Sequence, residues 1–155
     1  MSDQIVPVAC QNLLHDWATC IDTKSWDQMP ALFAPVVDLD YSALGQPKAP
    51  GVQPSVYIGH VSSPGQLGTP DVNTHHFIGA CKWMRESESQ ARVVFQIQAV
   101  HRRAPQDGNA AMLATGHGLN TMDFTLVQGE WKIAALKVGV LWIEGDLDKI
   151  FNPHH

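Results

Sequence analysis

Apolar residues recur at spacings of three and four near the start of the chain, which is the period of an α-helix. One such face, which predicts a helix over about Gln4 to Asp22, is formed by Leu14, Trp17, Ala18 and Ile21. The apolar positions of residues 26–33 also share a helical face. Pro30 lies within that second stretch, where its ring would clash with the preceding turn, so we expect a short or kinked helix.

The period then changes to two, which is typical of strands. Val37, Leu39 and Tyr41 alternate with aspartates, and a loop, a short helical stretch near Ser55 to His60 and a second loop at residues 62–73 follow. From Thr74 onward, alternation predicts strands near residues 74–86, 90–103, 111–127 and 131–142. The turns between them are predicted at 106–109 and 128–129, and a short helix is predicted over Asp146 to Phe151.

Helices followed by a meander of long strands are typical of an α+β fold. Short connections predict antiparallel neighbours, so we expect a curved, mostly antiparallel sheet covered by three or four helices. The chain has 155 residues, the usual size of one domain, and shows no linker. We therefore expect residues 1–155 to form a single domain, with His154 and His155 as a possible remnant of an expression tag.

Charge and cysteine usage narrow the function classes. The net charge is −5 and no run of Lys or Arg is present, which disfavours binding to nucleic acid. No stretch approaches the roughly 20 apolar residues of a membrane span, and the N-terminus lacks the features of a signal peptide. Cys10, Cys20 and Cys81 lie far apart, which predicts free thiols. We expect a cytoplasmic protein with neither nucleic-acid nor membrane partners.

Several polar residues fall on predicted apolar faces, namely Asp22, Tyr41, His101 and Asn120. Asp22 continues the buried stripe of the first helix, where a carboxylate is costly unless it is paired. His101 shares a strand face with Phe95, and Asn120 interrupts the apolar side of the next strand. Buried titratable groups that pair with one another are typical of acid–base sites.

Each of these residues has a structural alternative. A lone histidine on an apolar face is more often a core residue than a catalyst, and Asp22 could cap the following turn. A metal site formed by Asp22, His76 and His101 is conceivable, but no ligand-spacing motif supports it. His75 and His76 are adjacent in a strand, so they point to opposite faces. We predict no bound metal and no organic cofactor.

The sequence resembles the scytalone dehydratases, fungal melanin-pathway enzymes of the NTF2-like (SnoaL-like) superfamily. The resemblance rests on VSSPGQLGTPDVNTHHFIGACKW at residues 61–83 and on further matches at residues 15–29, 34–45, 129–137 and 145–151. It implies a cone-shaped fold and a cofactor-independent lyase that dehydrates a hydroxylated cyclic ketone of polyketide metabolism. It also implies a homo-oligomer, with a trimer expected first and a dimer second.

The resemblance carries the family's catalytic set onto this chain residue by residue. It implies catalytic roles for Asp22, Tyr41, His76, His101 and Asn120. His76 would act as the acid–base shuttle, Asp22 would orient His101, and Tyr41 would polarise the substrate carbonyl. Asn120 stands where the family has a serine that helps to hold the site.

The substrate-binding positions depart from the family pattern. Ile21 replaces a second water-holding tyrosine, Met122 replaces a substrate-binding asparagine, and His60 and Gln66 stand at apolar positions near the pocket mouth. The resemblance assigns substrate contacts to Ile21, Leu44, His60, Gln66, Met122, Leu136, Val138, Val140, Leu147 and Phe151. The residues around Leu147 to Phe151 would form a lid over the pocket.

These departures suggest an aromatic or polycyclic polyketide substrate other than scytalone. An isomerase, cyclase or rearrangement catalyst could use the same enolising pocket, because enolisation is common to all of these reactions. A small-molecule binder that has lost catalysis is the third alternative. The combination of Asp22, His76 and His101 favours an enzyme.

Overall fold

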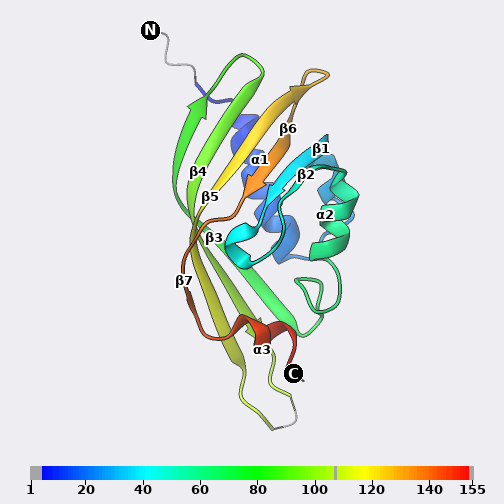
Figure 1. The fold of residues 1–155 in the computed structure, drawn as a ribbon, viewed down its shortest axis with the longest axis vertical. Helices are drawn as coiled ribbons and strands as arrows, with labels where there is room; N and C mark the ends of the chain where they lie inside the picture. The colour runs from blue at the N-terminus through cyan, green and yellow to red at the C-terminus, as the bar shows by residue number, and fades with distance from the viewer. Residues whose placement is uncertain (1–4, 107, 154–155) are drawn as a thin grey trace.

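One curved sheet organises the molecule (Figure 1). The structure, a computed structural model, describes residues 5–106 and 108–153, and within them seven strands form this sheet. The strands are β1 Phe33–Asp40, β2 Ala49–Val52, β3 Val72–Arg85, β4 Gln90–Arg103, β5 Met112–Val127, β6 Glu130–Lys137 and β7 Val140–Glu144. Their order is β2-β1-β6-β5-β4-β3, and β7 pairs with β5 beyond the end of β6.

Antiparallel pairing links β3, β4, β5 and β6 in a meander, as the short connections predict. Gln128 and Gly129 both have positive φ, which allows the two-residue turn between β5 and β6. β1 joins the sheet by pairing in parallel with β6, which the sequence pattern did not predict. The predicted turn at residues 106–109 includes Asp107, which lies outside the described residues.

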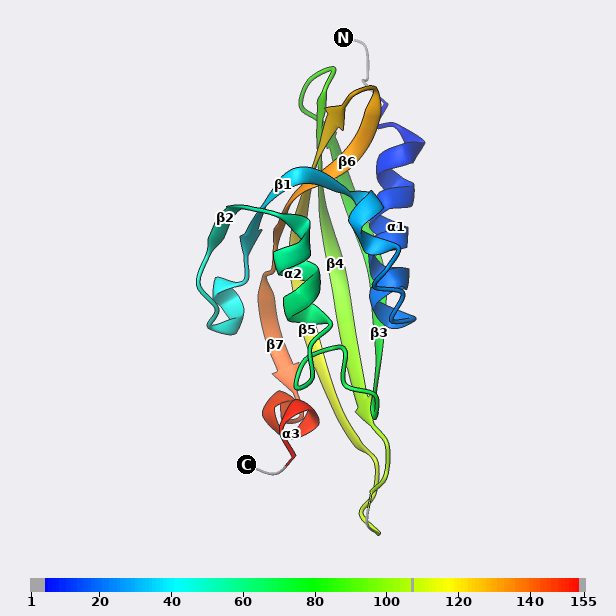
Figure 2. The same cartoon turned by 90° about the vertical axis from the view of Figure 1, so that its right-hand side faces the viewer.

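Three α-helices pack on the concave face of the sheet (Figure 2). α1 (Val8–Asp22) packs against β3 and β6, α2 (Pro54–Val61) against β1, and α3 (Leu147–Phe151) against β4 and β5. Two 3-10 turns, η1 (Met29–Leu32) and η2 (Ser42–Leu44), flank β1. Within the described residues, each helix falls short of the length and apolarity that crossing a bilayer requires. The predicted α+β cone is confirmed.

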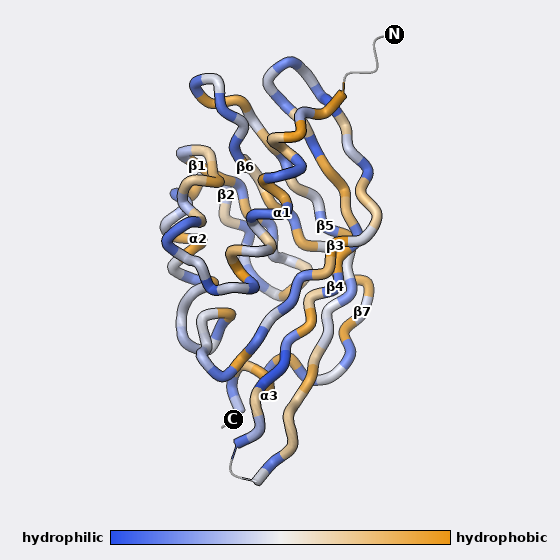
Figure 3. The backbone as a smooth tube through the Cα atoms, turned by 180° about the vertical axis from the view of Figure 1, so that it is seen from behind, coloured by the Kyte–Doolittle hydropathy of each residue, from blue (hydrophilic) through white to orange (hydrophobic). Residues whose placement is uncertain are grey.

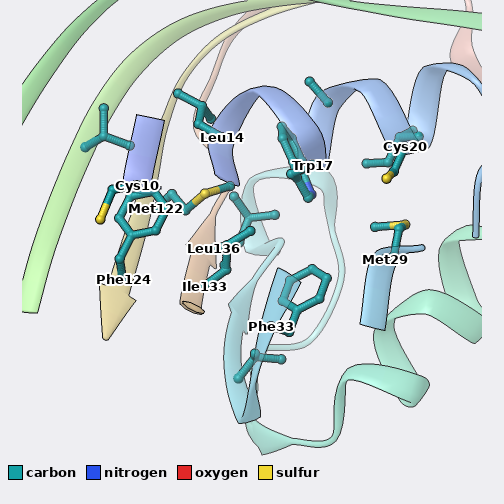
Figure 4. Close-up of a cluster of buried hydrophobic side chains, with 14 of the residues drawn as sticks. Cys10, Leu14, Trp17, Cys20, Met29, Phe33, Met122, Phe124, Ile133 and Leu136 are labelled. Atoms are coloured by element: carbon teal, nitrogen blue, oxygen red, sulfur yellow. The ribbon is translucent and has the colours of Figure 1, made fainter. Parts of the chain in front are cut away.

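The hydrophobic core fills the space between α1 and the upper half of the sheet. Figure 4 shows side chains of α1, η1 and the sheet meeting there, among them Cys10, Leu14, Trp17, Met29, Phe33, Met122, Phe124, Ile133 and Leu136. Met122 and Ile133 are fully buried. Full burial of side chains of this size stabilises a fold by roughly 1.5–3 kcal/mol each. This core therefore holds α1 firmly against the strands that carry the polar site.

The convex face of the sheet carries a stripe of exposed apolar side chains. Hydrophobic and hydrophilic residues alternate along the strands in Figure 3, so each strand presents one side to the core. On β5 and β7, however, large apolar residues also face outward, namely Leu113, Leu119, Leu141 and Trp142. The ring of His117 stacks on Trp142 with a centroid distance of 4.4 Å. We refer to these five residues as the outer stripe.

The structure corrects several predicted boundaries. The first helix begins at Val8, and residues 1–4 lie outside the described part. The second predicted helix, over residues 26–33, is only the turn η1, because Pro30 allows no longer helix. Tyr41 follows the end of β1 rather than lying in it, and β2 occupies a stretch predicted as loop. The predicted strand 131–142 is wrong as a single strand, because it divides into β6 and β7.

A close backbone approach explains that division. The carbonyl oxygen of Gly139 accepts a hydrogen bond from the Leu119 amide, and the Gly139 amide donates to the Asn120 side chain over 3.1 Å. A Cβ added at Gly118 would lie 2.2 Å from the Gly139 carbonyl oxygen. Glycine at 118 is therefore required for the chain to cross from β6 to β7 at this point.

We predict that Gly118→Ala lowers the free energy of unfolding by about 2 kcal/mol or more, because its methyl group would overlap the Gly139 backbone. Urea denaturation of the purified variant measures this change. Gly116→Ala is the matched control, because the same strand offers open space around a Cβ at Gly116. Equal stability of the two variants would contradict the steric explanation.

Candidate active site

The end of α1 and the middle of β3 are joined by one carboxylate. Asp22 is the last residue of α1, and its Oδ1 lies 2.7 Å from Nδ1 of His76. Its Oδ2 accepts a hydrogen bond of 2.8 Å from the backbone N–H of the same histidine. Both side chains are largely buried, with exposed fractions of 17% and 8%. Asp22 thus holds His76 by its main chain and its ring together.

This arrangement fixes what the His76 ring can do. A carboxylate accepts the Nδ1–H hydrogen, so in the neutral ring Nε2 is the unprotonated nitrogen. The ring also packs against Trp17, with centroids 5.4 Å apart and planes at 56°. Packing and hydrogen bonding together limit rotation of the imidazole. A histidine held in this way presents Nε2 as a proton acceptor next to a negative charge.

His101 has a different partner from the predicted one. Its Nδ1 lies 2.9 Å from Oγ1 of Thr74, the residue opposite it on β3. The predicted pairing of Asp22 with His101 is wrong in this structure, because both Asp22 oxygens bind His76. The pKa of His101 is lowered to about 4, mainly by burial, with a smaller lowering from the neighbouring His76 that Asp22 partly opposes. His101 is therefore neutral at pH 7.

Two tyrosines meet beside Trp17 of α1. The hydroxyl oxygens of Tyr41 and Tyr57 lie 3.0 Å apart, and the indole N–H of Trp17 donates to the Tyr57 hydroxyl over 3.2 Å. Burial is the main cause that raises the pKa of both phenols, so they stay protonated at neutral pH. Tyr41 thus has a second phenol, that of Tyr57, beside it. Ile21, which replaces the family's second water-holding tyrosine, is instead a core residue with 2% exposure.

The C-terminal helix is held over the lower half of the site. The buried Arg103 guanidinium donates to the main-chain oxygens of Ile150 and Phe151, over 2.5 and 3.4 Å. The Phe151 ring stands edge-on to His101, with centroids 5.3 Å apart. α3 therefore lies beside His101, and its predicted role as a lid stays a prediction.

A lysine links the end of α1 to the loop that follows α2. Lys24 has a left-handed backbone conformation, with φ of 55°, and its ammonium donates to the main-chain oxygen of Leu67. Burial lowers the pKa of this lysine. The loop from Ser62 to Thr69 is also tied within itself, because the Gly68 amide donates to the carbonyl oxygen of Val61. This loop is therefore anchored two residues after Asp22.

The remaining predicted residues differ in their burial. Asn120 is buried, and its side-chain oxygen accepts from the Gly139 amide, which leaves its amide nitrogen available to a ligand. Ile21, Met122 and Leu136 lie in the hydrophobic core. Leu44 and His60 are exposed, and intermediate exposure is found at Gln66, Val138, Val140, Leu147 and Phe151.

Four residues of the site were not predicted from the sequence: Trp17, Lys24, Tyr57 and Thr74. Trp17 had been placed only on the apolar face of α1. Thr74 lies on the same strand face as His76, two residues earlier, which is the signal that could have identified it. For Tyr57 no local signal exists, because its partners are 16 and 40 residues away in sequence.

A groove of about 460 Å³ opens along the seam between α1 and the edge strand β3. Asp22 and His76 belong to its lining, together with residues of α1 and with Phe77, Cys81 and Trp83 of β3. A second depression, of about 390 Å³, is lined by Phe33, Gln53 and their neighbours and contains none of the predicted site residues. Among residues 5–106 and 108–153, no cluster of three or more His, Cys, Asp or Glu side chains has a metal-binding arrangement.

Comparison with known proteins gives consistent results. A family model described as scytalone dehydratase matches residues 5–155. The scytalone dehydratase-like protein claB of Passalora fulva is 38% identical over 161 residues, covering 98% of this chain and 99% of that protein. The scytalone dehydratase of Pyricularia oryzae is 30% identical over 153 residues, covering 97% of this chain and 87% of that protein.

The fold is shared with solved structures. A candidate scytalone dehydratase from Novosphingobium aromaticivorans superimposes with a TM-score of 0.72 at 20% identity, over 89% of this chain and 85% of that one. At this level of identity the likeness concerns the fold, which is the NTF2-like cone.

We predict that stability depends on pH through His101. Its pKa is about 4 in the folded chain against about 6.5 when unfolded, so between these values the unfolded chain binds more protons. The free energy of unfolding should therefore fall on acidification from pH 6.5 to pH 4, by on the order of 3 kcal/mol. Urea denaturation across this range should show a flatter dependence for His101→Gln. His75→Gln, at an exposed position, should keep the wild-type slope, and an unchanged slope in His101→Gln would contradict the prediction.

Proposed function

The chain belongs to the scytalone dehydratase family, and we propose that it is a cofactor-independent hydro-lyase acting on a hydroxylated cyclic ketone. The observation that supports this most is the contact between Asp22 and His76, which leaves Nε2 of a buried imidazole as a base. Removal of a proton next to a carbonyl group requires such a base and a donor for the carbonyl oxygen. Tyr41 is our candidate for that donor.

In the proposed reaction, Nε2 of His76 removes the proton from the carbon between the carbonyl carbon and the carbon that bears the hydroxyl group. The electron pair forms an enolate, whose oxygen is hydrogen-bonded by Tyr41, and Asp22 stabilises the imidazolium. The enolate then re-forms the carbonyl, the carbon–oxygen bond to the hydroxyl breaks, and His76 returns its proton to that oxygen. The products are an unsaturated ketone and water, and tautomerisation to an aromatic ring follows.

His101 has a supporting role in this proposal. It is neutral, and if Thr74 donates to its Nδ1, its Nε2–H can hydrogen-bond the departing hydroxyl group. The amide nitrogen of Asn120 would add a donor for substrate. α3 would cover the bound ring, with Phe151 against His101 and Arg103 as its anchor. The relatives' names and this apolar cover suggest an aromatic or polycyclic polyketide as substrate.

The substitutions that test this proposal are His76→Ala and Asp22→Asn. With scytalone and related hydroxytetralones as probes, we expect His76→Ala to lower kcat by at least ~10²-fold, the lower range for one acid–base group. Asp22→Asn should also lower kcat, and the double variant should cost little more than the worse single variant, because the two residues act as one unit. Product mass identifies net loss of water.

His75→Ala is the control for these variants, because His75 is exposed and borders the same groove, whereas the hydrogen bonds of Asp22 go to His76. Its kcat should stay within a few-fold of wild type. A stable, fully active His76→Ala variant would end the dehydratase proposal. Turnover of the probes without water loss would favour an isomerase or cyclase, and binding without turnover would favour a binder.

We also propose that the chain works in the cytoplasm as a homo-oligomer, a trimer first and a dimer second. The thiols of Cys10, Cys20 and Cys81 are unpaired, as the cytoplasm favours. The outer stripe on β5 and β7 supports association, because contiguous exposed apolar side chains often mark interfaces between subunits. No nucleic-acid partner is proposed, in view of the net charge of −5.

Light scattering at micromolar concentration should give the mass of a trimer for the wild type. Trp142→Glu, which places a charge in the middle of the outer stripe, should shift the mass toward that of a monomer. Val56→Glu is the control, because Val56 on α2 is similarly exposed and lies outside the stripe. A monomer mass for the wild type would refute the oligomer, and a dimer mass would refute only the trimer.

A further inference from the structure

Trp17, Tyr57 and Tyr41 form a continuous hydrogen-bonded chain from the core of α1 to the site. Trp17 and Tyr57 are 2% and 3% exposed, and Tyr41 is half-buried. The indole Nε1–H of Trp17 donates to the Tyr57 hydroxyl over 3.2 Å, and that hydroxyl lies 3.0 Å from the Tyr41 hydroxyl. The chain links three residues from three separate segments: α1, α2 and the end of β1.

The indole group limits the directions that this chain can take. An indole N–H is a donor only, so the Tyr57 oxygen must accept from it. Either hydroxyl can donate to the other, but the hydrogen of a buried hydroxyl needs an acceptor. Tyr57 is more deeply buried than Tyr41, and the arrangement that satisfies its hydrogen has Tyr57 donating to Tyr41, which leaves the hydrogen of Tyr41 for a ligand.

The surroundings of Tyr57 hold its ring in place. The rings of Tyr57 and Phe33 meet edge to face, with centroids 5.6 Å apart and planes at 72°, which keeps the Tyr57 hydroxyl oxygen beside that of Tyr41. A hydroxyl that accepts a hydrogen bond becomes a better donor, because bonds in a chain polarise one another, and the effect is larger where water is excluded. Tyr41 is thus both oriented and strengthened as a donor by the residue behind it.

We propose that Tyr57 is a positioning residue that aims and strengthens the Tyr41 hydroxyl as a donor to a ligand oxygen that gains negative charge. The ligand class is a cyclic ketone or phenol whose oxygen becomes an enolate or phenolate. Trp17 is the fixed first donor, and its ring also packs on His76, so one α1 side chain supports both the base and the oxygen donor. This proposal rests on the proposed function in one respect, which is that the ligand oxygen belongs to an enolate.

The test is a binding series rather than an activity assay. Naphthols of increasing acidity are titrated into the wild type, Tyr57→Phe and Tyr41→Phe by fluorescence, and log Kd is plotted against naphthol pKa. In the wild type, affinity should rise with acidity, because a polarised donor favours an oxygen that carries more negative charge. Tyr57→Phe should lose about 10-fold in affinity for the most acidic naphthol and much less for the least acidic, which is the loss of about one hydrogen bond.

Tyr57→Phe keeps the ring but leaves the Trp17 N–H without its acceptor, so it should also lose stability. Phe33→Leu is the matched control, because it disturbs the packing of Tyr57 and leaves every hydroxyl in place. It should lower stability without changing the slope of the plot. In the Tyr41→Phe background, a further Tyr57→Phe change should leave the slope unaltered.

Three results would overturn the proposal: a wild type that binds none of the naphthols, a Tyr57→Phe slope equal to that of the wild type, or a Phe33→Leu slope that falls equally. These outcomes are separate from those of the dehydratase proposal. Failure of the chain to dehydrate any hydroxytetralone leaves the naphthol slopes measurable, and a loss of slope in Tyr57→Phe would still support the role of Tyr57.

Discussion

The site depends on one carboxylate that bridges a helix and a strand. Asp22 uses both oxygens on a single residue, His76, one for the backbone N–H and one for the ring. A largely buried carboxylate without such partners would be strongly unfavourable, so the contact that orients the imidazole also stabilises the docking of α1 on β3. The geometry of the proposed base and the folding of the chain are therefore coupled at this point. Trp17, five residues earlier on α1, packs on the same ring and strengthens the coupling.

The two halves of the proposed chemistry meet at one residue of α1. The base lies on β3, and the oxygen donors lie on α2 and after β1. Trp17 contacts both groups, with its ring against His76 and its N–H on Tyr57. A substrate that reaches both must lie beside Trp17, and His101, whose pKa is affected by His76, lies near the proposed base. The neutral state of His101 suits this position, because a second cation would oppose formation of an imidazolium at His76.

Local patterns in the sequence were sufficient to predict most helices and strands and the polar residues that point inward from them. The helix period predicted α1 and the buried position of Asp22, and the strand period placed His101 and Asn120 inward. The pairing of these residues was not predictable in the same way. Near the β3–β4 turn Arg85 pairs with Ala91, and this register, continued along the strands, would pair His75 with His101. A bulge between Ile78 and Cys81 shifts the register by one residue, so that Thr74 pairs with His101 instead. Tyr57 depends on contacts across the fold, which periodicity does not encode.

The anchoring of α3 has a consequence for how this chain can diverge. Arg103 binds the main-chain oxygens of residues 150 and 151, and a main-chain oxygen is present whatever the side chain. The tail can therefore exchange its side chains during evolution while it stays docked in the same place. Ile150, which is buried with Val72 and Ala114, is the most constrained by packing, whereas Leu147 and Phe151 are only partly buried against the same cluster. Under the proposed lid role, substrate preference can thus drift through Leu147 and Phe151 while the tail keeps its main-chain anchor, and a single arginine makes that freedom possible.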